Sequence, residues 1–132
     1  MRTIKFRGKL KSNGKWEYGD LLHDNFDGHY IYPIEVGGLY KSNEVIPETM
    51  GQFTELHDSN GNEIYEGDIL RLGNSSSGVC EVKWNTTMAA FCIQFFFERE
   101  LGTRTAGEWL IYEKKVEVIG NIYDNPELMK IE

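Results

Sequence analysis

Five turn-forming residues interrupt a run of β-forming residues near the middle of the chain. Residues 58–62 read Asp-Ser-Asn-Gly-Asn, and Asn60 and Gly61 both tolerate a positive φ angle. A second, tighter corner follows, in which Gly67 stands between Glu66 and Asp68. We expect Gly67 to adopt a backbone angle that a Cβ atom would forbid. Residues 51–70 therefore predict a strand, a polar turn and a second strand that continues through the corner into a buried run.

The same turn carries oxygen-bearing side chains that could be read as a calcium loop. The ligands would be Asp58, Asn60 and Asn62. An EF-hand loop requires a glutamate at its twelfth position, and Ile69 occupies that position in this sequence. We therefore expect a structural turn and no metal.

Four segments of the chain resemble the YopX family of phage and prophage proteins. They are residues 4–9, 45–54, 58–69 and 116–128, with the sequences IKFRGK, VIPETMGQFT, DSNGNEIYEGDI and VEVIGNIYDNPEL. The resemblance extends over nearly the whole chain and departs mainly at residues 71–78 and 95–107. It implies a phage-related origin and a small β-barrel of Src-homology-3-like shape in the C-terminal part. It implies no established activity and supplies no catalytic residues.

Length and composition fit a mainly β protein with little helix. The 132 residues are 40% hydrophobic and 13% aromatic, and 14 glycines provide for many turns. We expect residues 1–50 to form an N-terminal β-hairpin module and residues 51–132 to form the small barrel. No apolar window of about 18 residues could span a membrane, and the chain starts without a hydrophobic leader segment. A cytoplasmic protein of a bacterial host cell is therefore expected.

The segment before the last strand is ambiguous in sequence. Residues 99–107 are expected to form a loop. Residues 108–115 fit either a strand or a short helical turn, and the family resemblance favours the helical turn. Residues 116–123 should form the last long strand, followed by one helical turn with Asn125 as its N-cap and Pro126 as its first residue.

The charges are segregated along the chain. The first 15 residues carry six basic side chains and no acid, whereas the remainder carries 21 acids against eight bases. Residues 4–10 alternate between apolar and basic side chains, so Lys5, Arg7 and Lys9 should form a basic contact stripe on one face of a half-buried strand.

This stripe has three interpretations. It could protect an edge strand against pairing with other chains, bind phosphates, or dock on acidic residues of its own or a neighbouring chain. Nucleic acid is an unfavourable partner, because the whole chain has a net charge of −7 and we expect no aromatic side chains interleaved on the basic face. We favour edge protection over phosphate binding.

A hairpin is expected on either side of Thr86. If the turn is centred there, Cys80 lies opposite Cys92, and the charged Glu81 and Lys83 share the other face. A slip of one residue would bury those charges, which favours this register. The two cysteines would then be neighbouring, reduced packing thiols.

The second strand of that hairpin is apolar on both faces. Phe91, Ile93 and Phe95 lie on the face that Cys92 does not use. A small barrel has one interior, so the second face needs another cover. We expect these three side chains to contact the N-terminal module or another subunit, which makes them the candidate interaction face.

No catalytic arrangement emerges from the sequence. None of the three histidines stands beside a strained nucleophile turn. The polar loop from His23 to His29 could hold a divalent ion, but no further ligand pair with defined spacing follows it, so we expect solvated side chains. Glu66 and Asp68 could act as an acid/base pair, although a turn uses aspartate more often to bind nearby backbone. We expect no enzyme, no catalytic residue, no cofactor and no metal ligand.

Two functional classes remain. The first is a phage- or prophage-encoded accessory protein that acts by protein–protein interaction and self-association, as a homo-oligomer that also binds a host or phage protein. The alternative is a nucleic-acid-binding small β-barrel that uses Lys5, Arg7 and Lys9. A hydrolase with a loop-built site has no positive sign in the sequence.

Overall fold

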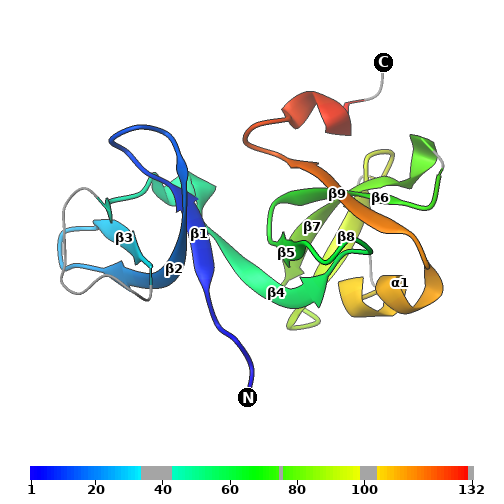
Figure 1. Cartoon of the computed structure of the whole chain (residues 1–132), viewed down its shortest axis with the longest axis horizontal. Helices are drawn as coiled ribbons and strands as arrows, with labels where there is room; N and C mark the ends of the chain where they lie inside the picture. The colour runs from blue at the N-terminus through cyan, green and yellow to red at the C-terminus, as the bar shows by residue number, and fades with distance from the viewer. Residues whose placement is uncertain (34–42, 75, 99–103, 131–132) are drawn as a thin grey trace. The chain divides into compact units, whose positions relative to one another are not determined.

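The computed structural model describes residues 1–33, 43–74, 76–98 and 104–130 (Figure 1). The chain divides into two compact units, Met1–Glu55 and Leu56–Glu132. The strand β4 (Gly51–His57) crosses this division, and the boundary that we expected after residue 50 falls at its start. The described part of the chain is mainly β, with two antiparallel sheets and one α-helix, which confirms the expected fold class.

The first unit is built on antiparallel strands in the order β3-β2-β1-β4. They are β1 (Phe6–Lys9), β2 (Trp16–His23), β3 (His29–Tyr32) and the first residues of β4, which the short 3-10 helix η2 (Pro47–Thr49) precedes. The β1–β2 ladder places Arg7 opposite Tyr18 and Lys9 opposite Trp16. The N-terminal hairpin predicted from the alternation of residues 4–10 is confirmed.

Ile31 and Val45 form the buried centre of the first unit, and both are completely inaccessible to solvent. They lie against Gly8, where an added Cβ atom would come within 3.1 Å of both Ile31 Cδ1 and Val45 Cβ. A larger residue at position 8 would have to displace a core side chain. Because side chains alternate along a strand, Arg7 and Lys9 lie on the face opposite this core.

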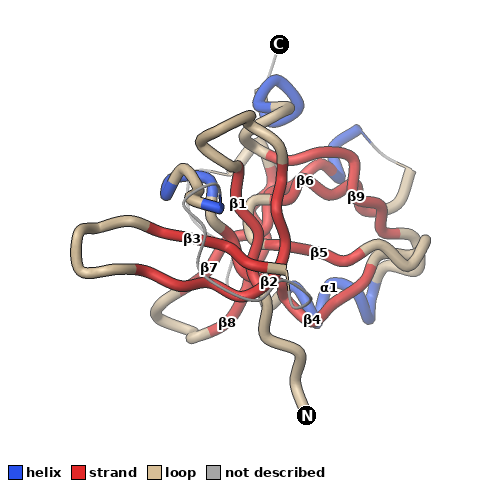
Figure 2. Tube along the Cα trace, turned by 60° about the vertical axis from the view of Figure 1, so that its left-hand side comes forward, coloured by secondary structure: helices blue, strands red, loops and turns tan. Residues whose placement is uncertain are grey.

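The second unit contains an antiparallel sheet in the order β8-β7-β6-β9. Its strands are β6 (Asp68–Leu72), β7 (Val79–Asn85), β8 (Ala90–Phe95) and β9 (Val116–Asn121), while β5 (Glu63–Tyr65) is the neighbour of β4. The short 3-10 helix η3 (Ser76–Gly78) joins β6 to β7. Figure 2 shows β6 and β9 side by side, joined by a ladder from Asp68↔Asn121 to Leu72↔Val116. This arrangement is consistent with a small β-barrel.

The central turn folds as the sequence predicts. The β4 and β5 strands flank it, and Gly61 has a φ angle of 84°. Gly67 follows with a φ angle of 92°, and an added Cβ atom there would lie 3.2 Å from the Tyr123 ring. Only glycine adopts that conformation without strain, so this corner directs the chain into β6.

The helix α1 (Ala106–Tyr112) precedes β9. Thr105 Oγ1 accepts the backbone N–H of Glu108, and the Glu108 carboxylate accepts the backbone N–H of Thr105, which together form a capping box. The helical turn implied by the family resemblance is therefore present, but it begins inside the segment expected to be a loop. Residues 99–103 of that segment lie outside the described residues.

The C-terminal turn is a 3-10 helix, η4 (Pro126–Met129), that carries its proline in the first turn as expected. The Asn125 side chain makes no cap bond to η4. Its Oδ1 instead accepts the backbone N–H of Asn121 at 3.3 Å, because the turn that follows β9 folds back on the strand end.

The core of the second unit draws on β5, β6, β7, β8, β9 and α1. Its buried members are Ile64, Leu70, Leu72, Cys80, Val82, Ile93, Ala106 and Val116. The partly buried side chains of Phe91, Phe95 and Trp109 pack against this cluster. Burial of so many apolar side chains is the main source of stability for the unit.

The predicted register of the β7–β8 hairpin is wrong. Cys80 lies opposite Phe95, and Cys92 lies opposite Lys83. The connection is a four-residue loop in which Asn85 Oδ1 accepts the Met88 N–H at 3.1 Å and Ala89 adopts a φ angle of 50°. The longer loop moves β8 along β7, and the shift buries Ile93 in place of the smaller Ala90.

Candidate functional site: an aromatic surface on the second unit

Phe91, Ile93 and Phe95 face the interior of the second unit. Ile93 is 1% exposed and belongs to the core, and the two phenylalanines pack against that core. They are the cross-strand partners of Trp84, Val82 and Cys80, so the observed register turns them inward. The face that we expected to need an outside cover is therefore covered by the unit itself. The register on which that expectation rested is wrong, and a contact of the partly buried Phe91 and Phe95 with another chain stays a prediction.

A connected row of aromatic side chains lies on the second unit instead. The Phe97 ring stacks on Phe95 with centroids 5.4 Å apart, and Phe95 meets the Trp109 ring edge-on at 5.3 Å. The Arg104 guanidinium lies 5.3 Å from the centre of the Trp109 ring and 4.7 Å from that of Tyr112. We call these five residues the aromatic row. Each contact is within the range of aromatic or cation–π attraction.

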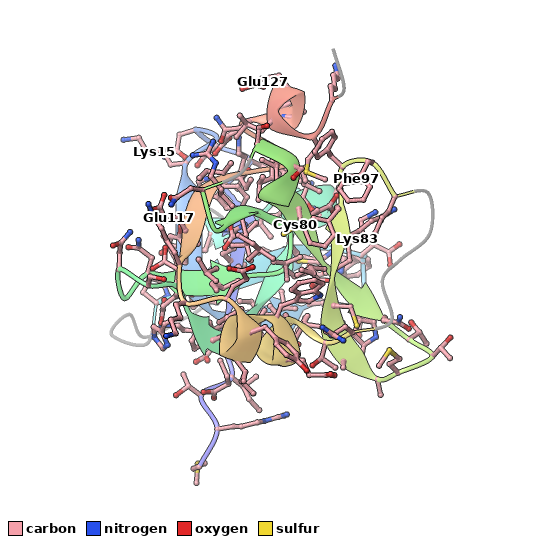
Figure 3. All side chains as sticks on the ribbon, turned by 90° about the vertical axis from the view of Figure 1, so that its right-hand side faces the viewer. Lys15, Cys80, Lys83, Phe97, Glu117 and Glu127 are labelled. Atoms are coloured by element: carbon pink, nitrogen blue, oxygen red, sulfur yellow. The ribbon has the colours of Figure 1, made fainter. Side chains whose placement is uncertain are left out.

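The row begins in the core and ends in solvent. Phe95 and Trp109 are partly buried, whereas Phe97 is 55% and Tyr112 66% exposed. Ile111, next to Tyr112 on α1, is 82% exposed. In Figure 3, Cys80 lies among the strands and Phe97 lies toward the outside of the unit. The row therefore joins a partly buried base to exposed apolar groups.

Sequence reasoning missed this row, although a signal for it was present. The Thr105-Ala-Gly-Glu108 segment has the spacing of a capping box, which marks the start of a helix. Had that start been recognised, Trp109 and Tyr112 would have fallen on adjacent turns of one helix. The contact between Phe95 and Trp109 depends on tertiary packing and has no local signal.

Both edge strands of the second sheet make some hydrogen bonds or bridges with nearby chain. Along β9, Asp58 Oδ2 accepts the N–H of Val118 at 3.0 Å, and Ser59 Oγ accepts the N–H of Val116 at 2.7 Å. Along β8, Cys92 forms a bridge with Thr105. Edge groups that already have partners are less available for pairing with other chains. The exposed aromatic groups are thus better suited to contacts than the strand edges are.

Asp58 accepts hydrogen bonds that hold the turn together, which agrees with the structural turn that we expected there. Its carboxylate accepts backbone N–H groups of Asn60 at 2.9 Å and Asn62 at 2.8 Å as well as that of Val118. Burial raises the pKa of this carboxyl, but the hydrogen bonds from Val118, Asn62 and Asn60 outweigh it and hold the pKa below its ordinary value. Asp68 is similar: it is 2% exposed and its Oδ2 accepts the N–H of Tyr65 at 2.7 Å.

The polar loop between β2 and β3 is also organised by an aspartate. Asp24 accepts the N–H groups of Phe26 and Gly28 and the hydroxyl of Tyr30, which lower the pKa of the carboxyl. The rings of His23 and His29 lie 6.1 Å apart. No group of three or more histidine, cysteine or acidic side chains suited to a metal ion occurs among the described residues.

The basic stripe differs from the expected exposed row of cations. Arg7 is only 5% exposed and lies 4.7 Å from the centre of the Trp16 ring, which Lys9 also approaches at 5.5 Å. Lys5 lies 5.2 Å from the centre of the Phe53 ring. The expectation that no aromatic side chains share this face was wrong, because Trp16 is the cross-strand partner of Lys9.

Three of the described titratable groups with displaced pKa values, Cys80, Glu81 and Cys92, lie on the β7–β8 hairpin. Burial raises the pKa of Cys80 to about 12 and raises that of Cys92 as well. Burial also raises the pKa of Glu81, although Lys83 lies 3.8 Å away. Burial of each single group explains its pKa shift. In an active site, by contrast, neighbouring charged groups usually shift one another's pKa.

Together these features define a mainly β protein of two units, the second consistent with a small β-barrel, with an aromatic surface built on a short capped helix. The YopX protein family model matches residues 5–130, and the chain belongs to this family. No curated protein sequence matched the chain. No described helix has the length and apolar character to cross a bilayer.

Two solved structures share the fold. Protein EF1440 from Enterococcus faecalis is 22% identical, with a TM-score of 0.60, and the alignment covers 98% of this chain and 100% of the other. Protein yopX from Bacillus subtilis is 20% identical, with a TM-score of 0.58 and coverage of 100% and 99%. At these identities the likeness concerns the fold alone.

Proposed function

We propose that this protein is a phage- or prophage-encoded accessory protein of the bacterial cytoplasm that acts by protein–protein interaction, including self-association, without catalysing a reaction. The aromatic row of the second unit carries the proposal. Of its exposed members, Phe97 stacks on the partly buried Phe95, and Tyr112 lies under the Arg104 guanidinium. The family resemblance supports the phage-related origin.

The composition of the row favours a protein partner. Aromatic residues and arginine are enriched where protein interfaces are most strongly bound, and lysine and acids are depleted there. A surface whose aromatic groups are already ordered loses little conformational freedom on binding. These properties fit a binding surface better than a substrate site.

The native mass tests this proposal. Sedimentation or light scattering on the whole protein should give a mass above the 15.2 kDa of one chain at micromolar concentration. Pull-down from a lysogenic host should recover a partner that a Phe97→Ser, Tyr112→Ser variant does not recover. Two results together would reject protein binding through the row: the mass of one chain at every concentration, and a variant that recovers the same partners as the wild type.

Nucleic-acid binding is the second candidate, and one observation favours it. Trp16 lies beside Arg7 of β1 and Phe53 lies beside Lys5, which precedes β1, and proteins that bind single strands combine basic and aromatic groups in this way. The burial of Arg7 opposes it, since a buried guanidinium does not reach a phosphate. Salt-sensitive retention on single-stranded DNA that is lost after Lys5→Glu and Lys9→Glu would favour this candidate.

A further inference from the structure

We propose that a second copy of this chain docks on the exposed face of α1, about a two-fold axis, so that Arg104 of each chain pairs with Glu108 of the other. We call Arg104, Glu108, Ile111 and Tyr112 the α1 face. This inference rests on the proposed self-association and names its surface and its partner.

The α1 face is contiguous. Residues three and four apart on a helix are neighbours, so Glu108 adjoins both Ile111 and Tyr112. Arg104 reaches the same surface, because its guanidinium lies over the Tyr112 ring and its Nε lies 4.0 Å from Glu108 Oε2. Ile111 and Tyr112 are the most exposed large apolar residues of the described part of the second unit.

The charges of this face complement a copy of the face itself. Arg104 and Glu108 have side chains that are 46% and 52% exposed, and their separation is at the limit of an ion pair. Exposed pairs of this kind contribute little within one chain. A two-fold axis brings residue i of one chain to residue j of the other and the reverse, so one cation beside one anion fits its own copy.

The same charges discriminate against other occupants. A nucleic acid or an anionic lipid surface would meet Glu108 as well as Arg104, and like charges oppose binding. A copy of the chain meets each charge with its opposite and places Ile111 and Tyr112 against apolar groups.

The helix offers a firm base for such a contact. The capping box fixes its first turn, Ala106 is 1% exposed, and Trp109 packs on Phe95. Glu108 uses Oε1 for the capping box, which leaves Oε2 directed at Arg104. Pairing across the axis therefore leaves the cap intact.

The first arm of the test compares apolar variants by sedimentation equilibrium of the whole protein. Ile111→Ser with Tyr112→Ser should raise the dimer dissociation constant at least tenfold. The matched control is Phe26→Ser with Met88→Ser, which removes two exposed apolar residues outside the α1 face and should leave the dissociation constant unchanged. Circular dichroism melts of both variants check that they remain folded.

The second arm tests the charges. Glutamine can replace glutamate in a capping box, so Glu108→Gln removes the charge and keeps the helix start. Glu108→Gln and Arg104→Gln should each weaken the dimer several-fold, and the double variant should be no weaker than either single one, because all three remove the same pairs. Additive effects, or no effect of either substitution, would overturn the pairing.

The outcomes separate this inference from the proposed function. A wild-type protein that forms oligomers but is indifferent to the serine variants would overturn the α1 interface and leave self-association through another surface. An odd-numbered ring, such as a trimer, or an open polymer whose assembly depends on the α1 face would overturn the two-fold arrangement. A wild-type protein that is a single chain at all concentrations would overturn both the α1 dimer and self-association.

Discussion

Asp58 Oδ2 accepts the backbone N–H of Val118 at 3.0 Å, across 60 residues of sequence. The same carboxylate closes the turn between β4 and β5, so one buried side chain ties that turn to β9. Hydrogen bonds to a charged acceptor are stronger than neutral ones, and an acceptor removed from several donors leaves them unsatisfied.

Replacing this carboxylate should destabilise the second unit. We expect Asp58→Ala to lower the free energy of unfolding by about 3 kcal/mol, with a smaller loss for Asp58→Asn, which keeps one acceptor oxygen. Urea unfolding at pH 7 measures both. The pKa of Asp58 is lower in the folded protein than its ordinary value. The contribution of this carboxylate to the free energy of unfolding is therefore complete above the pKa of the unfolded state, about 3.9, and declines as the pH falls through the pKa of the folded state. The gap between wild type and Asp58→Asn should therefore narrow below pH 4; a gap that widens would contradict this role.

Glu55 adopts a φ angle of 73° within β4, in the left-handed region that disfavours a Cβ atom. We expect Glu55→Gly to be about 1 kcal/mol more stable than Glu55→Ala, since glycine removes the strain and both variants lose the same carboxylate. That shared loss includes the contact between the Thr3 N–H and Glu55 Oε1. Thermal melts of the pair isolate the backbone effect, and equal melting temperatures would show that the conformation is unstrained.

Gly107 lies in the first turn of α1, and an added Cβ atom would meet only Thr105 Oγ1, at 4.0 Å. Alanine is a better helix former than glycine by about 1 kcal/mol in a helix interior. We expect Gly107→Ala to raise the stability of the second unit by up to about that amount and to leave its fold unchanged. Gly78→Ala is the contrasting control, because its Cβ atom would lie 2.2 Å from the Leu72 carbonyl oxygen. Chemical denaturation should show a gain for the first variant and a clear loss for the second.

The two cysteines should be unreactive in the folded protein. Both are fully buried, and burial raises the pKa of each thiol, to about 12 for Cys80. The thiolate is the reactive form, so a thiol reagent at pH 8 should label neither side chain until the protein unfolds. The ladder places Cys92 opposite Lys83 and not opposite Cys80, so mild oxidation should form no internal disulfide. A disulfide found by mass spectrometry in the folded protein would contradict the observed register.

The sequence predicts those parts of the fold that depend on local chemistry. The Asn60-Gly61 turn, the Gly67 corner and the alternation of the first strand each require particular residues at particular positions. The structural role of Asp68 followed from the same reasoning and is confirmed by its bond to Tyr65.

The parts that were not predicted depend on contacts between distant segments. The β7–β8 register depends on a loop that Asn85 closes from its side chain, and because β8 is apolar on both faces, the alternation of apolar residues does not settle which face pairs with the core face of β7. The burial of Arg7 depends on Trp16 across the ladder, which alternation along one strand does not reveal. The aromatic row needed both the capping box and the packing of Trp109 on Phe95.

Amide hydrogen exchange measured at increasing protein concentration tests the central claim most directly. If copies of the chain associate through α1, exchange in peptides covering residues 104–112 should slow as the concentration rises, while the loop at residues 24–28 exchanges at a constant rate. An exchange rate at residues 104–112 that is independent of concentration, in a protein shown by its mass to be oligomeric, would contradict the α1 face as the contact.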